Sequence, residues 1–509
     1  MRFGANRSSF PAVVNQPARS SVPRTGKIAI LLGVLAAAHV FCFAALFPFY
    51  SVVDEQMHLD LAVRYSHADP PRGLTPPDTN ALPYLVIYGS PEYLQTTGAI
   101  APPPWKQPMS AVRDQLIAKR AAYAEKFQNH EASQPPLYYT LAGMWWQVGR
   151  ALNLDGLALM YWLRFLNVPL IIALVWLGWV AAWRYFPDNR FVQVLVPALV
   201  AFLPQTTFYA LNNDILSPLT FGMAFLLVLE VWGTEIPDRR LALLTGLALA
   251  AVFLTKMSNL PLLGVAGLIL AVKFLNLAWQ GRLRAALPAL VRLMLGAALP
   301  VAAWMAWCKA NFGDLTGSAL KIKFLNWTDK PVGEWLHHPL FTVHGFWFFL
   351  KTNLATLWQG EELWHRLPLA NPAVDSTYVV LTLGALALTL AALVRPRSGF
   401  STPQRRVAVF GFLCLGAMLA FFALLSVKYD FQDCFYPSRE HPYFVSGRLM
   451  LGLLIPFLLL FAAGLDRLMG GFQTTTKFFV LVMLLGFMLA SEIATDWPVL
   501  GSEYNWFHM

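Results

Sequence analysis

Apolar segments close to the length of a membrane crossing constrain this chain more than any other feature. Eleven of them lie near residues 28–49, 161–183, 191–210, 215–233, 241–256, 258–277, 287–308, 374–394, 407–427, 446–466 and 478–497. A helix needs about 20 apolar residues to cross the hydrocarbon layer, and it satisfies its backbone hydrogen bonds internally. Only 13% of the residues are charged, against about 25% in soluble proteins. We therefore predict an all-α, polytopic helical membrane protein.

The basic residues predict how the chain is oriented. Short cytoplasmic loops of membrane proteins are enriched in Lys and Arg, and the basic segments here are 1–27, 273–292 and 395–406. Two further apolar stretches, 135–149 and 340–358, are short or interrupted by polar residues. All the basic loops fall inside only if both stretches lie along the membrane interface. We expect about eleven spans (between nine and thirteen), a cytoplasmic N-terminus and an external C-terminus in the cytoplasmic (inner) membrane.

This topology divides the chain into four parts and leaves two large external loops. The parts are a basic cytoplasmic tail at 1–27, a transmembrane module at 28–308 that includes an external loop at 50–159, a second external loop at 309–373 with an interfacial helix, and C-terminal spans at 374–509. The first loop is too long for a simple connector. Its amphipathic stretch 108–128 predicts a helix on the membrane surface. No nucleic-acid motif, Gly-rich phosphate loop or CxxC spacing occurs, so we expect no nucleic-acid partner.

Two adjacent acids, Asp54 and Glu55, follow the first apolar segment by about five residues. His58 lies four residues beyond Asp54, so both share one face of a short helix. A carboxylate there can deprotonate a hydroxyl or bind a divalent cation such as Mg or Mn, although no cofactor is certain. The alternative is that Asp54 only caps the helix.

Three more charged residues are predicted at the external ends of spans. Asp214 closes Leu211-Asn212-Asn213-Asp214, Lys256 ends Leu254-Thr255-Lys256, and Arg448 follows Gly447. Each has a simpler alternative: a turn for Asp214, and snorkelling to the interface for Lys256 and Arg448. His130 beside Glu131 is expected to be a solvated loop residue. Two acids and two bases on one membrane face nevertheless favour a functional site.

Together these motifs resemble the GT-C superfamily of integral-membrane glycosyltransferases. The resemblance rests on Asp54-Glu55, the segment Gln134-Pro-Pro-Leu-Tyr-Tyr139, Asn213-Asp214, Leu254-Thr255-Lys256 and Gly447-Arg448. It is nearest to bacterial relatives of the protein O-mannosyltransferase and lipid A aminoarabinose transferase type, and closest to a group of predicted bacterial membrane proteins of mostly unassigned substrate. The motifs cover roughly the first 260 residues and one late pair. Gln134 stands where many relatives have His.

The resemblance implies a sugar transfer, usually with inversion, from a polyprenyl-phosphate donor to a lipid, glycan or protein acceptor on the outer membrane face. Asp54 would be the catalytic base, or would position the acceptor or a metal, with Glu55 in support, and Asp214 would be the second acid. Lys256, and Arg448 with it, would hold the donor phosphate. The remaining substrate-binding candidates are His58, Gln134, Tyr138, Tyr139 and Asn213.

Two other classes of function remain open. A surface-polysaccharide polymerase or ligase would carry its key charges in a late external loop such as 428–445, with Lys428, Asp430, Asp433, Arg439, Glu440 and His441. A lipid flippase or transporter would place acids near the bilayer midplane, often within inverted repeats. The acids here are predicted at external helix ends and no repeat is visible, which favours the transferase over a transporter or a purely structural membrane protein.

Overall fold

The computed structural model describes residues 23–51, 54–96, 100–395, 399–432, 434 and 437–508. Most of the basic tail at 1–27 therefore lies outside the described residues. The regular elements of the described residues are helices apart from two small antiparallel strand pairs: β1 (Thr328–Asp329) pairs with β4 (Tyr429–Asp430), and β2 (Leu363–Trp364) pairs with β3 (Leu367–Pro368). The predicted all-α class is confirmed.

Nine helical segments of the described chain are long and apolar enough to cross a membrane. They are α1 (Arg24–Leu46), α6 with α7 (Gly156–Arg164, Asn167–Tyr185), η3 with α9 (Asn213–Leu216, Ser217–Gly233), η4 with α11 (Met257–Asn259, Leu260–Trp279), α12 (Leu283–Phe312), α15 (Pro372–Val394), α16 (Thr402–Lys428), η7 with α17 (Gly447–Leu453, Leu454–Leu468) and α18 (Thr474–Leu500). Nine lies within the predicted range.

The two other expected spans are shorter helices. The segment expected at 241–256 is α10 (Arg239–Thr255, 17 residues). The segment expected at 191–210 is α8 (Arg190–Ala201, 12 residues), after which the chain leaves the helix and forms the 3-10 turn η2 (Thr206–Tyr209). At 1.5 Å per residue, α8 is only about 18 Å long, so it does not cross the hydrocarbon layer as one helix.

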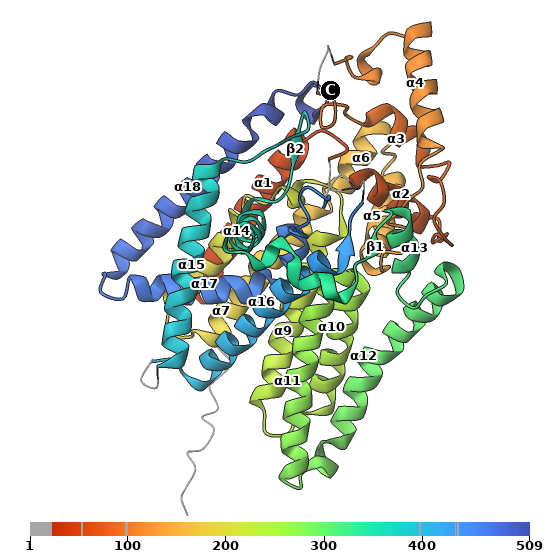
Figure 1. Ribbon diagram of the computed structural model, residues 1–509. Helices are drawn as coiled ribbons and strands as arrows, with labels where there is room; N and C mark the ends of the chain where they lie inside the picture. The colour runs from red at the N-terminus through yellow and green to blue at the C-terminus, as the bar shows by residue number, and fades with distance from the viewer. Residues whose placement is uncertain are drawn as a thin grey trace, which may run out of the picture.

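The two stretches expected along the interface are not among the nine candidate spans. They are α5 (Leu137–Ala151) and α14 (Val343–Gln359). The first external loop also holds α2 (Glu55–Ser66), α3 (Leu82–Tyr88), η1 (Pro104–Lys106) and α4 (Ala111–Ala124); the second also holds α13 (Ser318–Phe324), η5 (Val332–His337) and η6 (Pro339–Phe341). Helices α2 to α5 gather at one end of the molecule, beside α13 and the C-terminus (Figure 1).

Helix α17 is the centre of the bundle. In the apolar window of the span that η7 and α17 form together, 89% of the residues are buried, against 22% in the corresponding windows of α12 and α18, which flank the molecule on opposite sides in Figure 1. Small residues bring neighbouring helices close together: a Cβ at Gly246 of α10 would lie 2.2 Å from the backbone oxygen of Leu293 in α12. Helices α10 and α12 therefore approach each other at backbone distance at this position.

The C-terminal segment after α18, which ends in η8 (Trp506–His508), packs on the first external loop. The Ser502 hydroxyl donates to the Glu92 carboxylate, and the Tyr504 hydroxyl donates to the Ala101 carbonyl at 2.7 Å. These contacts place the C-terminus at the same end of the molecule as α2 to α5.

Candidate functional site

Asp54 precedes α2 in a left-handed backbone conformation (φ 61°), which is uncommon for a residue other than glycine. It occupies the N-cap position, but its side chain makes no capping hydrogen bond, so the alternative that Asp54 only caps the helix is wrong. Its carboxylate lies 3.5 Å from His130 Nε2 and 3.7 Å from Arg448 Nη2. Such backbone strain persists where the surroundings fix it, often at functional sites.

A second acid, Asp214, lies on the other side of Arg448. Asp214 Oδ1 is 2.5 Å from Lys256 Nζ, and Asp214 Oδ2 is 3.8 Å from Arg448 Nη1. The turn before α9 is made by Asn212, whose side chain accepts from the Asp214 backbone N–H at 2.9 Å. The Asp214 side chain is therefore not needed to form the turn. Arg448, which lies near both carboxylates, bridges Asp54 and Asp214.

These four charges come from four separate helix ends. Asp54 lies before α2, Asp214 in η3, Lys256 between α10 and η4, and Arg448 in η7 at the start of α17. The side chain of Lys256 is only 8% exposed and turns inward to Asp214, so the snorkelling alternative is wrong for this residue. We call Asp54, Asp214, Lys256 and Arg448 the charged cluster.

The loop before α5 supplies a further acid and a histidine. Glu131 accepts from the side chains of Gln134 and Lys321, the latter on α13. His130 Nε2 lies 3.5 Å from Asp54 and 3.6 Å from Glu131, and its side chain is 14% exposed. The expectation that His130 is a solvated loop residue is therefore wrong. In the sequence, the position of His130 next to Glu131, just before the Gln-Pro-Pro segment, was the signal that could have placed it near the site.

Gln134 and Asn213, both expected near substrate, link this loop to the charged cluster. The amide nitrogen of Asn213 donates to the side-chain oxygen of Gln134 at 3.0 Å and to the carbonyl of Thr255 at 3.2 Å. Asn213 thus ties the loop before α5 to the end of α10 and to the turn that carries Asp214.

Glu55 faces a different partner from Asp54. Its carboxylate accepts from Arg164 at 2.9 Å (Nε) and 2.6 Å (Nη2), and from the backbone N–H of Leu211 at 2.8 Å. Arg164 also donates to the carbonyls of Ala44 and Pro48, at the end of α1. Sequence reasoning missed Arg164, although a basic residue in an apolar segment is itself a functional signal. Because both oxygens of Glu55 are engaged, we interpret it as a positioning residue.

Three of the candidate substrate-binding residues are aromatic and contact one another: His58, Tyr138 and Tyr139. His58 Nδ1 is 2.7 Å from the Tyr139 hydroxyl, and the two rings stack with their centroids 5.8 Å apart. Tyr138 packs edge-on against Tyr139 at 5.5 Å. All three side chains are buried. Burial lowers the pKa of His58 to about 4, so this imidazole is neutral at physiological pH.

The two acids that flank His130 are ionised at neutral pH. Burial alone would favour the neutral form of Asp54, but the hydrogen bond from His130, together with the charges of His130 and Arg448, lowers its pKa. Burial likewise opposes ionisation of Glu131, while Lys321 and then His130 hold its pKa well below the usual range. The site therefore presents carboxylates that can accept a proton beside cations that can hold an anion.

One group of side chains in the described residues could hold a cation. Asp54, His130 and Glu131 each offer one ligand atom, and these atoms lie within 4.8 Å of one another. The sequence left the metal ligands unknown, with Asp54 and Glu55 as the candidates; of these only Asp54 belongs to this group, because the Glu55 carboxylate pairs with Arg164. Two carboxylates and one imidazole suit a divalent ion such as Mn.

The late loop, where a ligase would carry its charges, forms two local ion pairs. Arg439 pairs with Asp430 at 3.0 Å, and Lys428 lies 3.5 Å from Asp329. The side chains of Arg439 and Asp329 are 58% and 71% exposed. Asp433 lies outside the described residues. Ion pairs this exposed contribute little stability, and these two pairs do not join the charged cluster.

Comparisons with known proteins complete the description. A family profile described as predicted membrane protein (DUF2142) matches residues 39–430. No curated protein matches the chain. ArnT from Cupriavidus metallidurans, solved bound to undecaprenyl phosphate, is 12% identical over 94% of this chain and 66% of its own, with a TM-score of 0.48. The oligosaccharyltransferase of Archaeoglobus fulgidus, solved with zinc and sulfate, is 14% identical over 92% of this chain and 53% of its own, with a TM-score of 0.44. The chain thus spans just under two thirds of the first protein and about half of the second.

Proposed function

The chain belongs to the DUF2142 family of predicted membrane proteins, and from that premise and its own site we propose that it is a membrane glycosyltransferase of the GT-C type. It transfers a sugar from a polyprenyl-phosphate donor to a lipid, glycan or protein acceptor on the outer face of the cytoplasmic membrane. The observation that carries the proposal is the convergence of Asp54 and Asp214 on Lys256 and Arg448.

Lys256 and Arg448 are assigned to the donor phosphate. A lipid phosphate must be held at the bilayer surface while its tail stays in hydrocarbon, and both residues stand at the ends of apolar helices. The contacts of Arg448 with the carboxylates of Asp54 and Asp214, 3.7 and 3.8 Å, are longer than the 2.7–2.9 Å of a charge-assisted hydrogen bond. A phosphate can therefore compete with them, and it matches the guanidinium fork well.

Asp54 is assigned to the acceptor as general base. The acceptor hydroxyl oxygen attacks the anomeric carbon of the donor sugar, and its proton passes to the Asp54 carboxylate. The bond between the anomeric carbon and the phosphate oxygen breaks, and the phosphate keeps the electron pair. Because negative charge grows on the leaving phosphate, fixed cations beside it stabilise the transition state. Attack from the face opposite the leaving group inverts the anomeric centre.

Three acids and a histidine complete the assignment. Asp214 holds Lys256 in place through their 2.5 Å contact, and as the second acid it orients the donor. Glu55 positions the start of α2 through Arg164. A divalent cation bound by Asp54, His130 and Glu131 would supply positive charge at the reacting centre.

The test is the variant Asp54→Asn, assayed in membranes. We expect transfer of radiolabelled sugar from polyprenyl phosphate to fall by at least about a hundredfold, because general base catalysis typically contributes 10²–10⁴. Asp69→Asn is the matched control, since Asp69 is an exposed acid just after α2. Equal activity in Asp54→Asn and Asp69→Asn membranes, at equal protein level, would exclude Asp54 as the base.

The same assay separates the transferase from the ligase alternative. Arg439→Ala breaks the exposed pair with Asp430 without touching the charged cluster. We expect this variant to keep its activity. Loss of transfer in Arg439→Ala with full activity in Asp54→Asn would move the chemistry to the late loop.

A further inference from the structure

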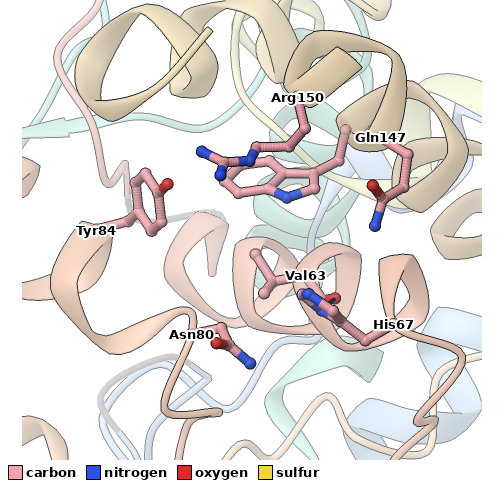
Figure 2. A pocket seen from close by; sticks show the side chains of 7 residues that line it. Val63, His67, Asn80, Tyr84, Gln147 and Arg150 are labelled. Atoms are coloured by element: carbon pink, nitrogen blue, oxygen red, sulfur yellow. Dashed lines mark hydrogen bonds between the residues drawn. The ribbon is translucent and has the colours of Figure 1, made fainter. Parts of the chain in front are cut away.

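A second site lies at the far end of the α2–α5 pair. A pocket of about 200 Å³ is lined there by Val63, His67, Asn80, Tyr84, Trp146, Gln147 and Arg150. Figure 2 shows its polar side chains converging on one space from α2, α3, α5 and the segment before α3. The volume is below the 300–1,000 Å³ of sites for drug-sized ligands, which suits a ligand of one or two rings.

The pocket is separate from the charged cluster but connected to it through α2 and α5. His58 and His67 are nine residues apart on α2 and its C-terminal cap, which corresponds to about 14 Å along the helix axis. Helices α2 and α5 pack closely at Gly143, where a Cβ would lie 2.7 Å from the backbone nitrogen of Ser66. The α2–α5 pair therefore carries His58 and Tyr139 at the end near the charged cluster and the pocket at its other end.

The lining combines an apolar floor with a polar rim. Trp146 and Val63 are buried, and the Tyr84 ring meets Trp146 edge-on at 5.1 Å. The remaining lining residues carry amide, imidazole, phenol and guanidinium groups, and no acid lines the pocket among the described residues. A sugar ring has the matching surface, because its C–H faces are apolar and its edge is a ring of hydroxyl groups.

The rim can both donate and accept, as hydroxyl groups require. The Gln147 amide nitrogen donates to the Ser66 carbonyl at 2.9 Å, which leaves the amide oxygen as an acceptor. His67 Nδ1 lies 2.9 Å from the Val63 carbonyl, so this nitrogen carries the proton in the neutral ring and Nε2 is an acceptor. Arg150 supplies donors only.

The faces of α5 indicate that the pocket opens away from lipid. Met144, Val148 and Leu152 form an exposed apolar stripe, at 58%, 46% and 57% exposure. At about 100° per residue, Trp146 and Arg150 lie on the opposite side of the helix. If the stripe contacts the bilayer interface, the pocket faces water, which favours a soluble saccharide over a phospholipid headgroup.

We propose that this pocket is a saccharide-binding subsite that holds the acceptor glycan of the transferase. That the bound glycan is the acceptor rests on the proposed function, whereas saccharide binding in the pocket does not require catalysis. Of the three acceptor classes in the proposed function, lipid, glycan and protein, this inference favours glycan.

The test uses full-length protein in detergent on an array of bacterial surface glycans. We expect the wild type to bind a subset of glycans, and Gln147→Ala and Arg150→Ala to bind the same glycans at least about tenfold more weakly, since loss of one hydrogen bond of about 1.4 kcal/mol is tenfold in affinity. Gln115→Ala and Arg72→Ala, at exposed positions of the same external loop, are the matched controls and should bind like the wild type.

Two further measurements separate the outcomes. The first is sugar transfer: if wild-type membranes show no sugar transfer while glycan binding persists, the proposed function fails and the saccharide site stands. Failure of the wild type to bind any glycan would overturn the inference. So would binding to phosphatidylglycerol vesicles that Arg150→Ala abolishes, with no glycan binding, because it would identify a lipid headgroup site.

Discussion

At the scale of the residue, the reactivity of Asp54 depends on His130. The carboxylate is held in a left-handed backbone position beside His130 Nε2 at 3.5 Å. Burial is the largest influence and opposes its ionisation, but the hydrogen bond and charge of His130, together with the charge of Arg448, lower the pKa of Asp54. A base with a lowered pKa is ionised throughout the physiological range, at the cost of weaker basicity. His130 is therefore expected to set the lower pH limit of the reaction.

Removing the histidine should move that limit upward. In His130→Ala, burial and the charge of Glu131 dominate, so the pKa of Asp54 rises and the acid limb of the pH–rate profile shifts to higher pH. The same shift affects the stability of the fold. Because the folded-state pKa of Asp54 is lowered, its ionised form stabilises the protein above the unfolded pKa of about 3.9, and this stabilisation is lost as the pH falls through the folded-state pKa. The shift of the acid limb is checked by measuring sugar transfer against pH, with His337→Ala, at an exposed histidine of the second loop, as control. An unchanged acid limb in His130→Ala would contradict the assignment.

At the scale of the element, the ends of helices could be predicted from the sequence, but not the side chains that reach them from elsewhere. Asp214, Lys256 and Arg448 each adjoin an apolar segment, so membrane topology alone places them on one face. Arg164 is inside such a segment, and Lys321 is on a short helix of the second loop. Their pairing with Glu55 and Glu131 depends on how distant loops fold back. No local pattern specifies that path.

The α2–α5 contact gives a prediction about one glycine. A Cβ at Gly143 would lie 2.7 Å from Ser66 N and 2.9 Å from Tyr65 C, both backbone atoms. Gly143→Ala should therefore separate the helices and cost about 1–3 kcal/mol of stability, with loss of sugar transfer. Gly264→Ala on α11 is the control, because nothing lies within 4 Å of its Cβ position and alanine favours a helix by up to about 1 kcal/mol. Thermal unfolding in detergent measures both; equal melting temperatures would contradict the close packing.

At the scale of the whole molecule, helices α2 to α5 and the basic turn between α11 and α12 lie at opposite ends. Helices α2 to α5 lie at one end of the structure, and the turn between α11 and α12, which carries Arg282, lies at the other (Figure 1). The positive-inside rule predicts that the basic end is cytoplasmic. With that orientation, η7 at the start of α17 would present Arg448 toward the outer face, where the proposed polyprenyl-phosphate sugar would be used. The orientation predicted from the sequence and the position of the cluster are thus mutually consistent, and labelling can test them together.

Single cysteines at the two ends should react differently. In a background without Cys42, Cys308, Cys414 and Cys434, Arg72→Cys in the first external loop should react with a membrane-impermeant maleimide on intact cells. Arg284→Cys, at the start of α12, should react only after the membrane is permeabilised, because lysine- and arginine-rich loops are retained in the cytoplasm. Each variant serves as the control for the other, since both replace an exposed arginine. The reverse pattern would place the charged cluster in the cytoplasm and remove the basis for an outer-face donor.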